Sequence, residues 1–533
     1  MKNQVISFQE THQFSSLVSD YLLGDSKLKP FYNLPPEIAS FDKIFDQRKQ
    51  FECNRDVLVK ALHNQYKNLL GSNTDAGKIT SSAIDSLSSE NTFTVTTGHQ
   101  LNIFTGPLYS LYKILTTIKL ADSLNEKYQD KNVIPVFWMA SEDHDFEEIN
   151  HLHVFGKKYE WNYPAKGAAG RLSTTGIEQI ASELKAVFRD SVEMLEYFEK
   201  AYAESQNLAE ATRKIMHHLF GSFGLIIIDG DDPDLKQLFV PEMEQDIFES
   251  TAYHAVMSTS AQLQLNYKVQ VQPREINLFY LDNNLRERIV KSENGTFQVL
   301  NGDISFSEAE LREALHAAPQ KFSPNVVMRP LYQEKILPNL SYIGGPGELN
   351  YWLQYKLMFE KFNISFPVLM LRNCMMVIDS STLSKIRKIG LKPNDLFKST
   401  DSLLFDLIEN STEVPLHTDH VQAGILKLFE ELSGNYKQVD ATLVPAVEAE
   451  KQKTVKAIQT LEEKARRSLK KKNETIVNQL KSVKEKLFPG NGLQERHENG
   501  LTFFQLYGNS FIKELYQHTD PFRKEFLIIT DEE

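Results

Sequence analysis

The residues best suited to chemistry form an acidic run directly after a short apolar segment. The run comprises Glu142, Asp143, His144 and Asp145, with Asn150 close behind. Crowded carboxylates repel one another unless a cation compensates, so the run favours binding of an ammonium group, a ribose or a metal ion. His144 would serve as a general base near neutral pH. An acid-rich helix start, which is common and stabilising, explains the run equally well.

A metal ion at this run is conceivable because His151 and His153 follow it. A metal-free site ranks above it, since the sequence shows no set of three ligands with the geometry that zinc takes. We therefore predict no resident metal, and Mg²⁺ only as the companion of a nucleotide.

A glycine-containing loop follows the preceding apolar run. The string TTGHQ is followed, after three residues, by FTGP. Its glycines would let the backbone approach a phosphate, and His99 would neutralise charge that develops there. The alternative is a tight turn with a surface histidine, because the loop is neither GxGxxG nor a P-loop. The candidate binding residues of this loop are Gly98, Gln100, Thr105 and Gly106.

A third polar segment combines an arginine with a glycine-rich turn. Arg329 suits bidentate binding of a carboxylate or phosphate, and the string GGPGELNYW offers free amides at a helix start. The alternative is a turn whose glycines only satisfy backbone angles, which the density of special residues disfavours. Arg372 and Asn373 end a later apolar run and would line the same cleft. The candidate binding residues of the turn are Gly344, Gly345, Gly347, Glu348, Tyr351 and Trp352.

Five predicted strands, the first a β-rich run and the others apolar, would position these clusters. A helix that starts at a proline, over residues 108–128, joins the first two runs in a βαβ unit. The pattern predicts an α/β fold with an open, doubly wound parallel sheet. Ligands of such folds lie beyond the carboxyl ends of the strands, so the three clusters should meet there. The predicted strands are residues 93–97, 133–140, 225–229, 341–343 and 367–371.

Two stretches interrupt this pattern. We expect residues 151–220 to be mostly helical, and residues 268–302 alternate apolar and polar side chains as antiparallel hairpins do. Elsewhere, residues 42–70 and 349–362 each predict one helix, and residues 71–90 predict a loop with one short helix.

The clearest long helix covers residues 446–487. Its apolar side chains recur at three- and four-residue steps, as in the seam of a coiled coil, and Pro489 ends it. The helix contains the basic run KARRSLKKK. A solvated face is the first interpretation of that run, pairing with an acidic face of a second subunit the next, and nucleic acid the third, because no aromatic residue is interleaved for stacking.

Composition bounds the class of protein. The 533 residues are 41% hydrophobic and 24% charged, and their net charge of −12 disfavours nucleic acid as a partner. Two cysteines, Cys53 and Cys374, indicate a reducing compartment. No secretory pattern opens the sequence, and its apolar runs are too short to cross a bilayer. We expect a cytoplasmic protein without a membrane partner.

Three long strings of this sequence together carry a resemblance to a known family. They are TTGHQLNIFTGPLYSLYKILTTIKLA, PVFWMASEDHDFEEINH and RPLYQEKILPNLSYIGGPGELNYW. The chain resembles the bacillithiol-synthesis cysteine-adding enzymes, a family of cysteine ligases. The likeness continues through PVLMLRN and the long helix, so it covers most of the chain in order. EDHDFxExN and YIGGPGExxYW are its specific strings.

The resemblance implies a fold and an activity. The fold is a Rossmann-like core related to class I aminoacyl-tRNA synthetases, with connecting-peptide insertions and a coiled coil that forms a homodimer. The activity is amide formation between the carboxylate of L-cysteine and the amine of glucosaminyl malate. A carboxylate is a poor electrophile, so activation is expected, with ATP or ADP as the nucleotide. No clean HIGH or KMSKS motif of the synthetases is present, and His99 and the Lys385 region are only positional substitutes.

The three clusters together predict one catalytic crevice for activated cysteine. His99 and His144 would contact phosphate or move protons, and Asp143 or Asp145 would hold the substrate ammonium group. Two other functions stay open: a non-catalytic coiled-coil scaffold of a thiol-synthesis complex, and an RNA-binding relative of the synthetases. The expected organisation is a mainly helical segment over 1–90, a core over 91–389 with insertions near 151–220 and 255–325, a coiled-coil domain over 390–498, and a return to the core over 499–533.

Overall fold

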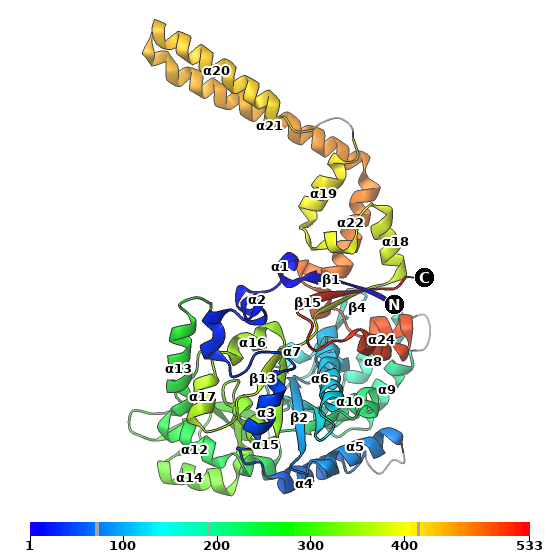
Figure 1. Cartoon of the computed structure of the whole chain (residues 1–533), viewed down its shortest axis with the longest axis vertical. Coiled ribbons are helices and arrows are strands. Elements are labelled where there is room, and N and C mark those ends of the chain that lie inside the picture. The colour runs from blue at the N-terminus through cyan, green and yellow to red at the C-terminus, as the bar shows by residue number, and fades with distance from the viewer. Residues whose placement is uncertain (70–73, 189–191, 283, 413–415, 533) are drawn as a thin grey trace. The chain divides into compact units, whose positions relative to one another are not determined.

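The computed structural model describes residues 1–69, 74–188, 192–282, 284–412 and 416–532 (Figure 1). The chain divides into two compact units. The larger unit holds Asn3–Met376 and Gly492–Leu527, and the smaller holds Met1–Lys2, Val377–Asn491 and Ile528–Glu533. The larger unit contains all three of the polar clusters.

A parallel five-stranded sheet forms the centre of the larger unit, in the order β13-β12-β2-β3-β6. Its strands are buried almost throughout, which explains why β3, β6 and β13 are nearly continuous apolar runs. β2 and β12 also bury polar side chains, among them Thr94, Thr96 and Asn339. Along the chain the order runs one way from β2 to β6 and then returns to the other side of β2, as in a doubly wound sheet. The strands are β2 (Thr92–His99), β3 (Asn132–Met139), β6 (Ile226–Asp229), β12 (Asn339–Gly344) and β13 (Val368–Leu371).

Helices surround this sheet (Figure 1). They pack on it through apolar side chains. Helix α6 (Leu108–Lys127) runs between β2 and β3 and buries Leu120 and Leu124 in a cluster with Phe93 and Val95. Helix α3 (Ser40–Arg48) adds three more members of the same cluster, which are Phe41, Ile44 and Phe45.

Two of the expected single helices are each divided in the structure. The first is α3 followed by α4 (Arg55–Tyr66), which begins where the Asn54 side chain accepts a hydrogen bond from Val57. The second is α16 (Pro346–Trp352) followed by α17 (Lys356–Lys361). Between them the Gln354 side chain accepts hydrogen bonds from the backbone of Gln270 and Val271, so this residue serves a loop contact at the break. Periodicity alone did not show either break.

The prediction that residues 151–220 are mostly helical is wrong at its start. Strands β4 (His151–Val154) and β5 (Lys157–Glu160) form an antiparallel hairpin there. Phe155 and Gly156 join them with positive φ angles of 52° and 76°, as a tight hairpin turn requires. Helices follow only afterwards: α8 (Ile177–Val187), α9 (Glu193–Ala203) and α10 (Leu208–Phe220).

The alternating segment forms a second, antiparallel sheet in the order β10-β9-β8-β7-β11. The hairpins predicted there are confirmed, although the first strand begins at Leu278 and not near residue 268. Asn283, between the first two strands of this sheet, lies outside the described residues. The strands are β7 (Leu278–Asp282), β8 (Leu285–Lys291), β9 (Phe297–Val299), β10 (Ser305–Phe306) and β11 (Phe322–Pro324).

Further elements lie wholly or partly in the larger unit. Helix α5 (Asp75–Ser86) is twelve residues long, and so fills most of the region predicted as a loop. The C-terminal strand β15 (Glu525–Thr530) lies in a three-stranded sheet of order β1-β15-β14. The others are β1 (Lys2–Ser7), α1 (Phe8–Thr11), α2 (Ser16–Leu23), α7 (Phe146–Ile149), α11 (Pro233–Gln237), α12 (Val240–Glu249), α13 (Thr251–Leu263), α14 (Glu308–Ala317), α15 (Met328–Ile336), β14 (Met375–Ile378), α23 (Leu501–Tyr507) and α24 (Ser510–His518).

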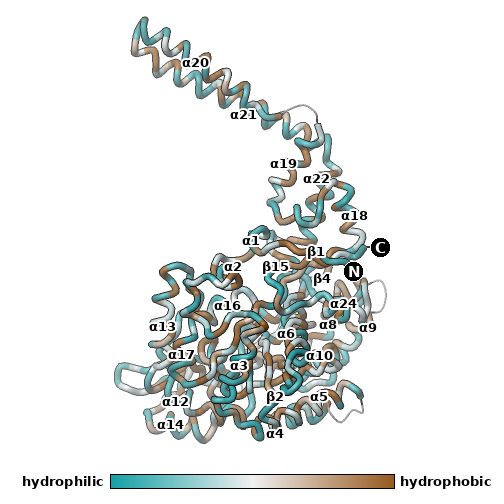
Figure 2. Tube along the Cα trace, viewed as in Figure 1, coloured by the Kyte–Doolittle hydropathy of each residue, from teal (hydrophilic) through white to brown (hydrophobic). Residues whose placement is uncertain are grey.

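The smaller unit is helical and contains a long hairpin of two helices. Helix α20 (Asp419–Val439) lies beside α21 (Val444–Lys472), and both alternate hydrophilic and hydrophobic residues (Figure 2). The predicted continuous helix is interrupted at Asn473, whose φ of −103° and ψ of 29° separate α21 from α22 (Glu474–Leu487). The remaining helices are α18 (Ser380–Lys388) and α19 (Thr400–Glu409).

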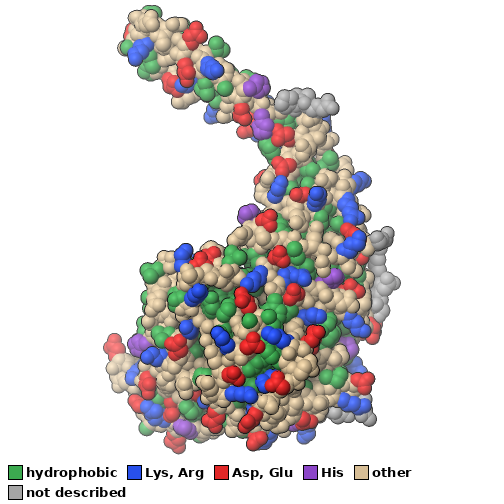
Figure 3. All heavy atoms as spheres, in the orientation of Figure 1, with side chains coloured by type: hydrophobic (Ala, Val, Ile, Leu, Met, Phe, Trp, Pro, Cys, Tyr) green, Lys and Arg blue, Asp and Glu red, His purple; other side chains and the backbone are tan. Residues whose placement is uncertain are grey.

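No helix within the described ranges has the length and apolar character needed to cross a bilayer. Acidic and basic side chains are interspersed over the visible face of the molecule (Figure 3).

Candidate active site

The first and third polar clusters meet at the carboxyl edge of the parallel sheet. β2 and β12 are neighbours, and the chain reverses its direction of winding between them, which is where open α/β sheets bind their ligands. A Cβ atom at Gly98 would lie 3.6 Å from both Arg329 Nη1 and Tyr342 Oη. The glycine loop and the arginine therefore lie side by side where the sequence predicts the crevice, and this name is kept below for the residues at this edge.

Lys113 ties the two sides of this crevice together. Its ammonium group, on a side chain only 2% exposed, donates to the Gly98 carbonyl and lies 2.7 Å from Glu348 Oε2. Glu348 also accepts hydrogen bonds from the Tyr342 hydroxyl (2.6 Å) and the Gly345 amide (2.7 Å). Burial alone would raise the pKa of Glu348, but Lys113 and these two donors outweigh it and hold the pKa below its usual range.

His99 is a partly exposed, neutral imidazole whose Nε2 atom is buried. Burial lowers its pKa to about 3, and the nearby Lys113 ammonium adds to the effect. The ring packs edge-on against Tyr109, with centroids 5.1 Å apart. Its Nε2 atom has no hydrogen-bond partner within the described part of the chain. His99 can thus offer a hydrogen bond to a ligand but not a positive charge.

One donor atom of Arg329 remains available for a ligand. Its Nη1 donates to Gln333 Oε1 at 3.0 Å, and its guanidinium lies 5.6 Å from the Tyr342 ring centroid. Its buried Nη2 finds no hydrogen-bond partner among the residues that the structure describes. A buried cationic donor of this kind suits a carboxylate or a phosphate.

Arg372 and Asn373 serve to hold the chain together. Arg372 makes two hydrogen bonds to Glu495, at 2.9 and 2.6 Å, and both side chains are 1% exposed. The Asn373 side chain donates to the Asp520 carbonyl at 2.7 Å. Both contacts secure the segment after residue 491 against the core, so the two residues support the crevice from behind.

The acidic run forms a second polar centre beside the first. Asp143 accepts hydrogen bonds from the Gln100 side chain (3.0 Å) and from the His144 amide (2.8 Å). Burial would raise the pKa of Asp143, but the nearby His144 side chain, the Gln100 side chain, the Arg286 guanidinium and the His144 amide together hold it well below its usual range. Gln100 also donates to Glu148 at 2.5 Å, so it joins the glycine loop to the acidic run.

The other members of the run have distinct surroundings. Glu142 is paired with the fully buried Lys236, and burial still raises the pKa of the carboxyl. The His144 Nδ1 atom lies 2.6 Å from Arg286 Nη1. Asp145 is exposed, directly before α7. Asn150 is buried, and its side chain reaches Glu160 at 3.5 Å.

The glycine loop is held in an unusual conformation. Phe104 and Thr105 have φ angles of 51° and 72°, and Gly106 has 65°. A Cβ atom at Gly106 would lie 2.6 Å from the Asn102 Cβ, so only glycine fits. The Asn499 side chain donates to the carbonyls of Phe104 (2.9 Å) and Gly106 (2.6 Å) and fixes the turn. Such strain often marks a ligand-binding segment.

The aromatic residues after the glycine-rich turn differ in role. Trp352 is fully buried and stacks on Tyr342, with centroids 4.4 Å apart. It therefore supports the crevice by packing. Tyr351 is partly exposed, and burial of its hydroxyl raises its pKa. Gly344 and Gly347 lie at the two ends of the turn, where a Cβ atom would meet Glu348 at 3.2 Å and Gln270 at 3.5 Å.

Several residues of the site were missed from the sequence. Lys113 lies on the apolar helix α6, and a lysine among buried positions was the available signal. Arg286 lies within the alternating segment, where nothing in the sequence indicates that it contacts His144 and Asp143. Lys236 and Glu495 carry no local signal, because each meets its partner only through the fold.

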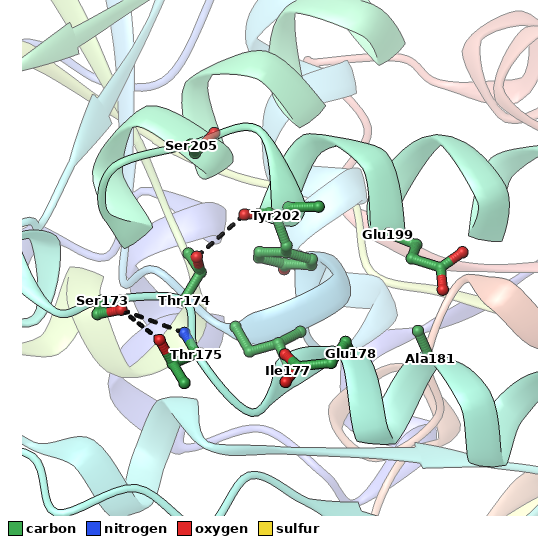
Figure 4. Close-up of a pocket in the computed structure, with 10 residues that line it drawn as sticks. Ser173, Thr174, Thr175, Ile177, Glu178, Ala181, Glu199, Tyr202 and Ser205 are labelled. Atoms are coloured by element: carbon green, nitrogen blue, oxygen red, sulfur yellow. Dashed lines mark hydrogen bonds between the residues drawn. The ribbon is translucent and has the colours of Figure 1, made fainter.

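A separate pocket of about 390 Å³ lies between α8, α9 and the loop before α8 (Figure 4). Its lining includes Ser173, Thr175, Glu199 and Tyr202, and none of the predicted site residues is among its lining residues. Within the described ranges, no group of three His, Cys, Asp or Glu side chains could hold a metal ion.

The parallel sheet and its helices define a Rossmann-like α/β domain, which is accompanied by a coiled-coil domain. Residues 1–373 match the family "Bacillithiol biosynthesis BshC, N-terminal Rossmann-like domain", and residues 375–530 match "Bacillithiol biosynthesis BshC, C-terminal coiled-coil domain". The chain therefore belongs to the bacillithiol biosynthesis BshC family. The resemblance, the Rossmann-like fold and the coiled coil predicted from the sequence are confirmed.

Relatives named "Putative cysteine ligase BshC" match over their full length. The protein of Flavobacterium johnsoniae is 41% identical, with 99% of this chain and 100% of the relative covered. That of Flavobacterium psychrophilum is 39% identical, with 99% of each covered, and that of Cytophaga hutchinsonii is 39% identical, with 97% and 96% covered. A solved structure described as a "putative arginyl t-RNA synthetase" from Campylobacter jejuni is 11% identical, covers 83% of this chain and 98% of its own, and has a TM-score of 0.21, which carries no argument.

Proposed function

We propose that this protein is a cysteine ligase of bacillithiol synthesis that joins the carboxylate of L-cysteine to the amine of glucosaminyl malate. Full-length similarity to relatives named cysteine ligases supports the reaction class. The observation that carries the proposal is one crevice that offers buried donors for an anion on one side and an ionised carboxylate on the other.

The anion-binding side is formed by Arg329 and His99. Each has a buried nitrogen without a hydrogen-bond partner among the described residues, and such atoms are costly unless a ligand pairs with them. Lys113 keeps this side positive, although Glu348 compensates part of its charge. A carboxylate or a phosphate group fits this set of donors.

The amine-binding side is formed by the acidic run. Asp143 stays ionised because its pKa is held low, so it can pair with a substrate ammonium group. One oxygen of Asp143 accepts a hydrogen bond from the side chain of Gln100, which belongs to the loop on the anion side. The two sides are thus connected, and one small molecule that carries both a carboxylate and an amine can bridge them.

A nucleotide is part of this proposal. The buried donors of Arg329 and His99 fit a phosphate, and Mg²⁺ would arrive with it. When bound, ATP would give the cysteine carboxylate a better leaving group than oxide. The protein's own part is to orient the carboxylate, to hold the amine and to exclude water.

A reconstituted reaction tests the proposal. Purified protein is mixed with L-cysteine and glucosaminyl malate, with ATP, with ADP or without nucleotide, and the products are identified by mass spectrometry. Formation of the amide only with protein, cysteine and nucleotide is the expected result. Absence of the amide under every condition, together with no heat of cysteine or ATP binding in calorimetry, would favour the scaffold function instead.

A further inference from the structure

We infer that Arg286 fixes the tautomer of His144, so that Nδ1 accepts a hydrogen bond and Nε2 carries the proton. His144 would then present a hydrogen-bond donor to the substrate and not a base. The assignment of the tautomer depends only on the geometry below, whereas the role of the donor in the reaction rests on the proposed function.

Arg286 comes from outside the parallel sheet. It lies on β8 of the antiparallel insertion, whereas His144 follows β3 of the core sheet. Its side chain is 6% exposed, although its neighbours Glu287 and Arg288 on the same strand are partly or fully exposed. A buried arginine on an otherwise exposed strand segment points to a specific partner.

The guanidinium of Arg286 is locked in place. Its Nε donates to Ser323 Oγ at 3.2 Å, and its Nη2 donates to the Pro324 carbonyl at 3.3 Å. Its plane lies 4.0 Å from the centroid of the Phe279 ring. These contacts leave Nη1 as the group that faces the acidic run.

Nη1 lies 2.6 Å from His144 Nδ1 and 3.7 Å from Asp143 Oδ1. A guanidinium nitrogen can only donate, since arginine has no acceptor atom. A proton on Nδ1 would therefore set two donors against each other at hydrogen-bond distance. The neutral ring avoids this conflict only with its lone pair on Nδ1 and its proton on Nε2.

Further contacts hold the His144 ring next to Nη1 of Arg286. The His144 amide donates to Asp143 Oδ1 at 2.8 Å, and the imidazole lies 5.6 Å from the Phe279 ring that also supports Arg286. Arg286, Asp143 and His144 thus form one unit. The side chain of His144 is 49% exposed, so substrate can reach it.

This tautomer changes the chemistry open to His144. The free Nε2–H would donate to an oxygen that carries negative charge, such as an oxygen of the activated carboxylate. Proton abstraction from the incoming amine would have to use another acceptor or water. The insertion sheet thereby acts on the reaction through a positioning residue.

The tautomer can be measured directly in the full-length protein. Two-bond ¹⁵N–¹H correlation spectra of protein labelled with ¹⁵N-histidine distinguish the two neutral forms, and the H144Q variant assigns the His144 signals. We expect Nε2–H in the wild type and in R286K, because an ammonium group also only donates. In R286M the two tautomers should mix, with kcat reduced about 10- to 100-fold and KM changed far less.

The variant R288M, at an exposed position of the same strand, is the matched control and should keep the wild-type spectrum. A wild-type ring protonated at Nδ1, or an unchanged tautomer in R286M, would overturn the inference. Circular dichroism checks folding, and the wild-type spectrum decides the question even if R286M does not fold. An Nε2–H ring in a protein without ligase activity would overturn the proposed function alone, whereas an Nδ1–H ring in an active ligase would overturn the inference alone.

Discussion

Glu348 supports the anion side of the site in two ways. It compensates the Lys113 ammonium, which is buried and could not stay charged there without a partner. It also anchors the glycine-rich turn through the Gly345 amide. A single carboxylate therefore supports both the electrostatics and the backbone of the crevice.

Replacement E348Q should destabilise the protein by about 3 kcal/mol, because it leaves the ammonium of Lys113 buried and unpaired. Urea denaturation followed by circular dichroism measures the change. The control is E360Q, which removes an exposed pair with Lys356 and should cost less than about 1 kcal/mol. Equal losses in the two variants would contradict this account of Glu348.

The same carboxylate predicts a dependence of stability on pH. Its folded pKa lies below the ordinary value of 4.5, so its contribution is fully present above that value. The contribution is lost as pH falls through the folded pKa and the carboxylate is protonated. The free energy of unfolding should fall less steeply between pH 5 and lower values in E348Q than in the wild type. Parallel curves for the two proteins would show that Glu348 has no such role.

Asp143 is the residue that should matter most for the amine. D143N keeps the shape of the side chain but removes the charge that pairs with an ammonium group, so ligase activity should fall about 100-fold or more. The thermal midpoint should fall as well, because the low pKa of Asp143 means that its charge stabilises the folded protein, so the activities are compared at a temperature where circular dichroism shows both proteins folded. D303N, at an exposed acid in the loop between β9 and β10, is the control for loss of one charge. Near-normal product formation by D143N would remove Asp143 from the mechanism.

At the scale of the elements, the glycine loop is the segment under most strain. Its turn requires a positive φ at Gly106 and leaves no room for a Cβ beside Asn102. G106A should therefore cost more than G508A, where φ is also positive at 59° but no atom lies within 4 Å of the added carbon. We expect about 1 kcal/mol for G508A and at least 2 kcal/mol more for G106A in urea denaturation. Similar losses in the two variants would show that the loop relaxes.

Most of the central sheet was predictable because β3, β6 and β13 are nearly continuous apolar runs, and because β2, rich in β-branched residues, ends at a glycine. The β4–β5 hairpin was not, because its four-residue strands are too short to stand out from the helices that follow. The string HLHV does alternate, and the next two residues, Phe155 and Gly156, form the turn. That alternation was the one usable signal.

The site was predictable only in part, for a related reason. Glycine-rich turns and acidic runs at strand ends can be located once the strands are known, so the Gly98 loop and Arg329 were placed together correctly. Lys113 and Arg286 act across the fold, where no spacing along the chain predicts a contact. Only the structure shows which residues they contact. Lys113 and Arg286 nevertheless supply two of the positive charges of the site.

At the scale of the whole molecule, the small unit leaves apolar side chains uncovered. Leu428 on α20 is 67% exposed, and Leu461 on α21 is 59% exposed. α20 has no buried residue at all, and Val447 is the one buried residue of α21. Two helices of this length are stabilised little when they bury so few apolar side chains against each other. We therefore propose that a second copy of the chain covers these residues.

This proposal predicts a dimer that a single surface charge can break. L428E or L461E should shift the mass in sedimentation velocity from two chains to one, because a carboxylate would be buried without a partner at the interface. Q452E, at an exposed polar position of α21, adds the same charge and should leave the mass unchanged. A wild-type protein that sediments as a single chain at high concentration would contradict the proposal. The described residues of the site all belong to the larger unit. We therefore expect product formation to persist when the dimer dissociates, which would show that the coiled coil assembles the protein without completing the site.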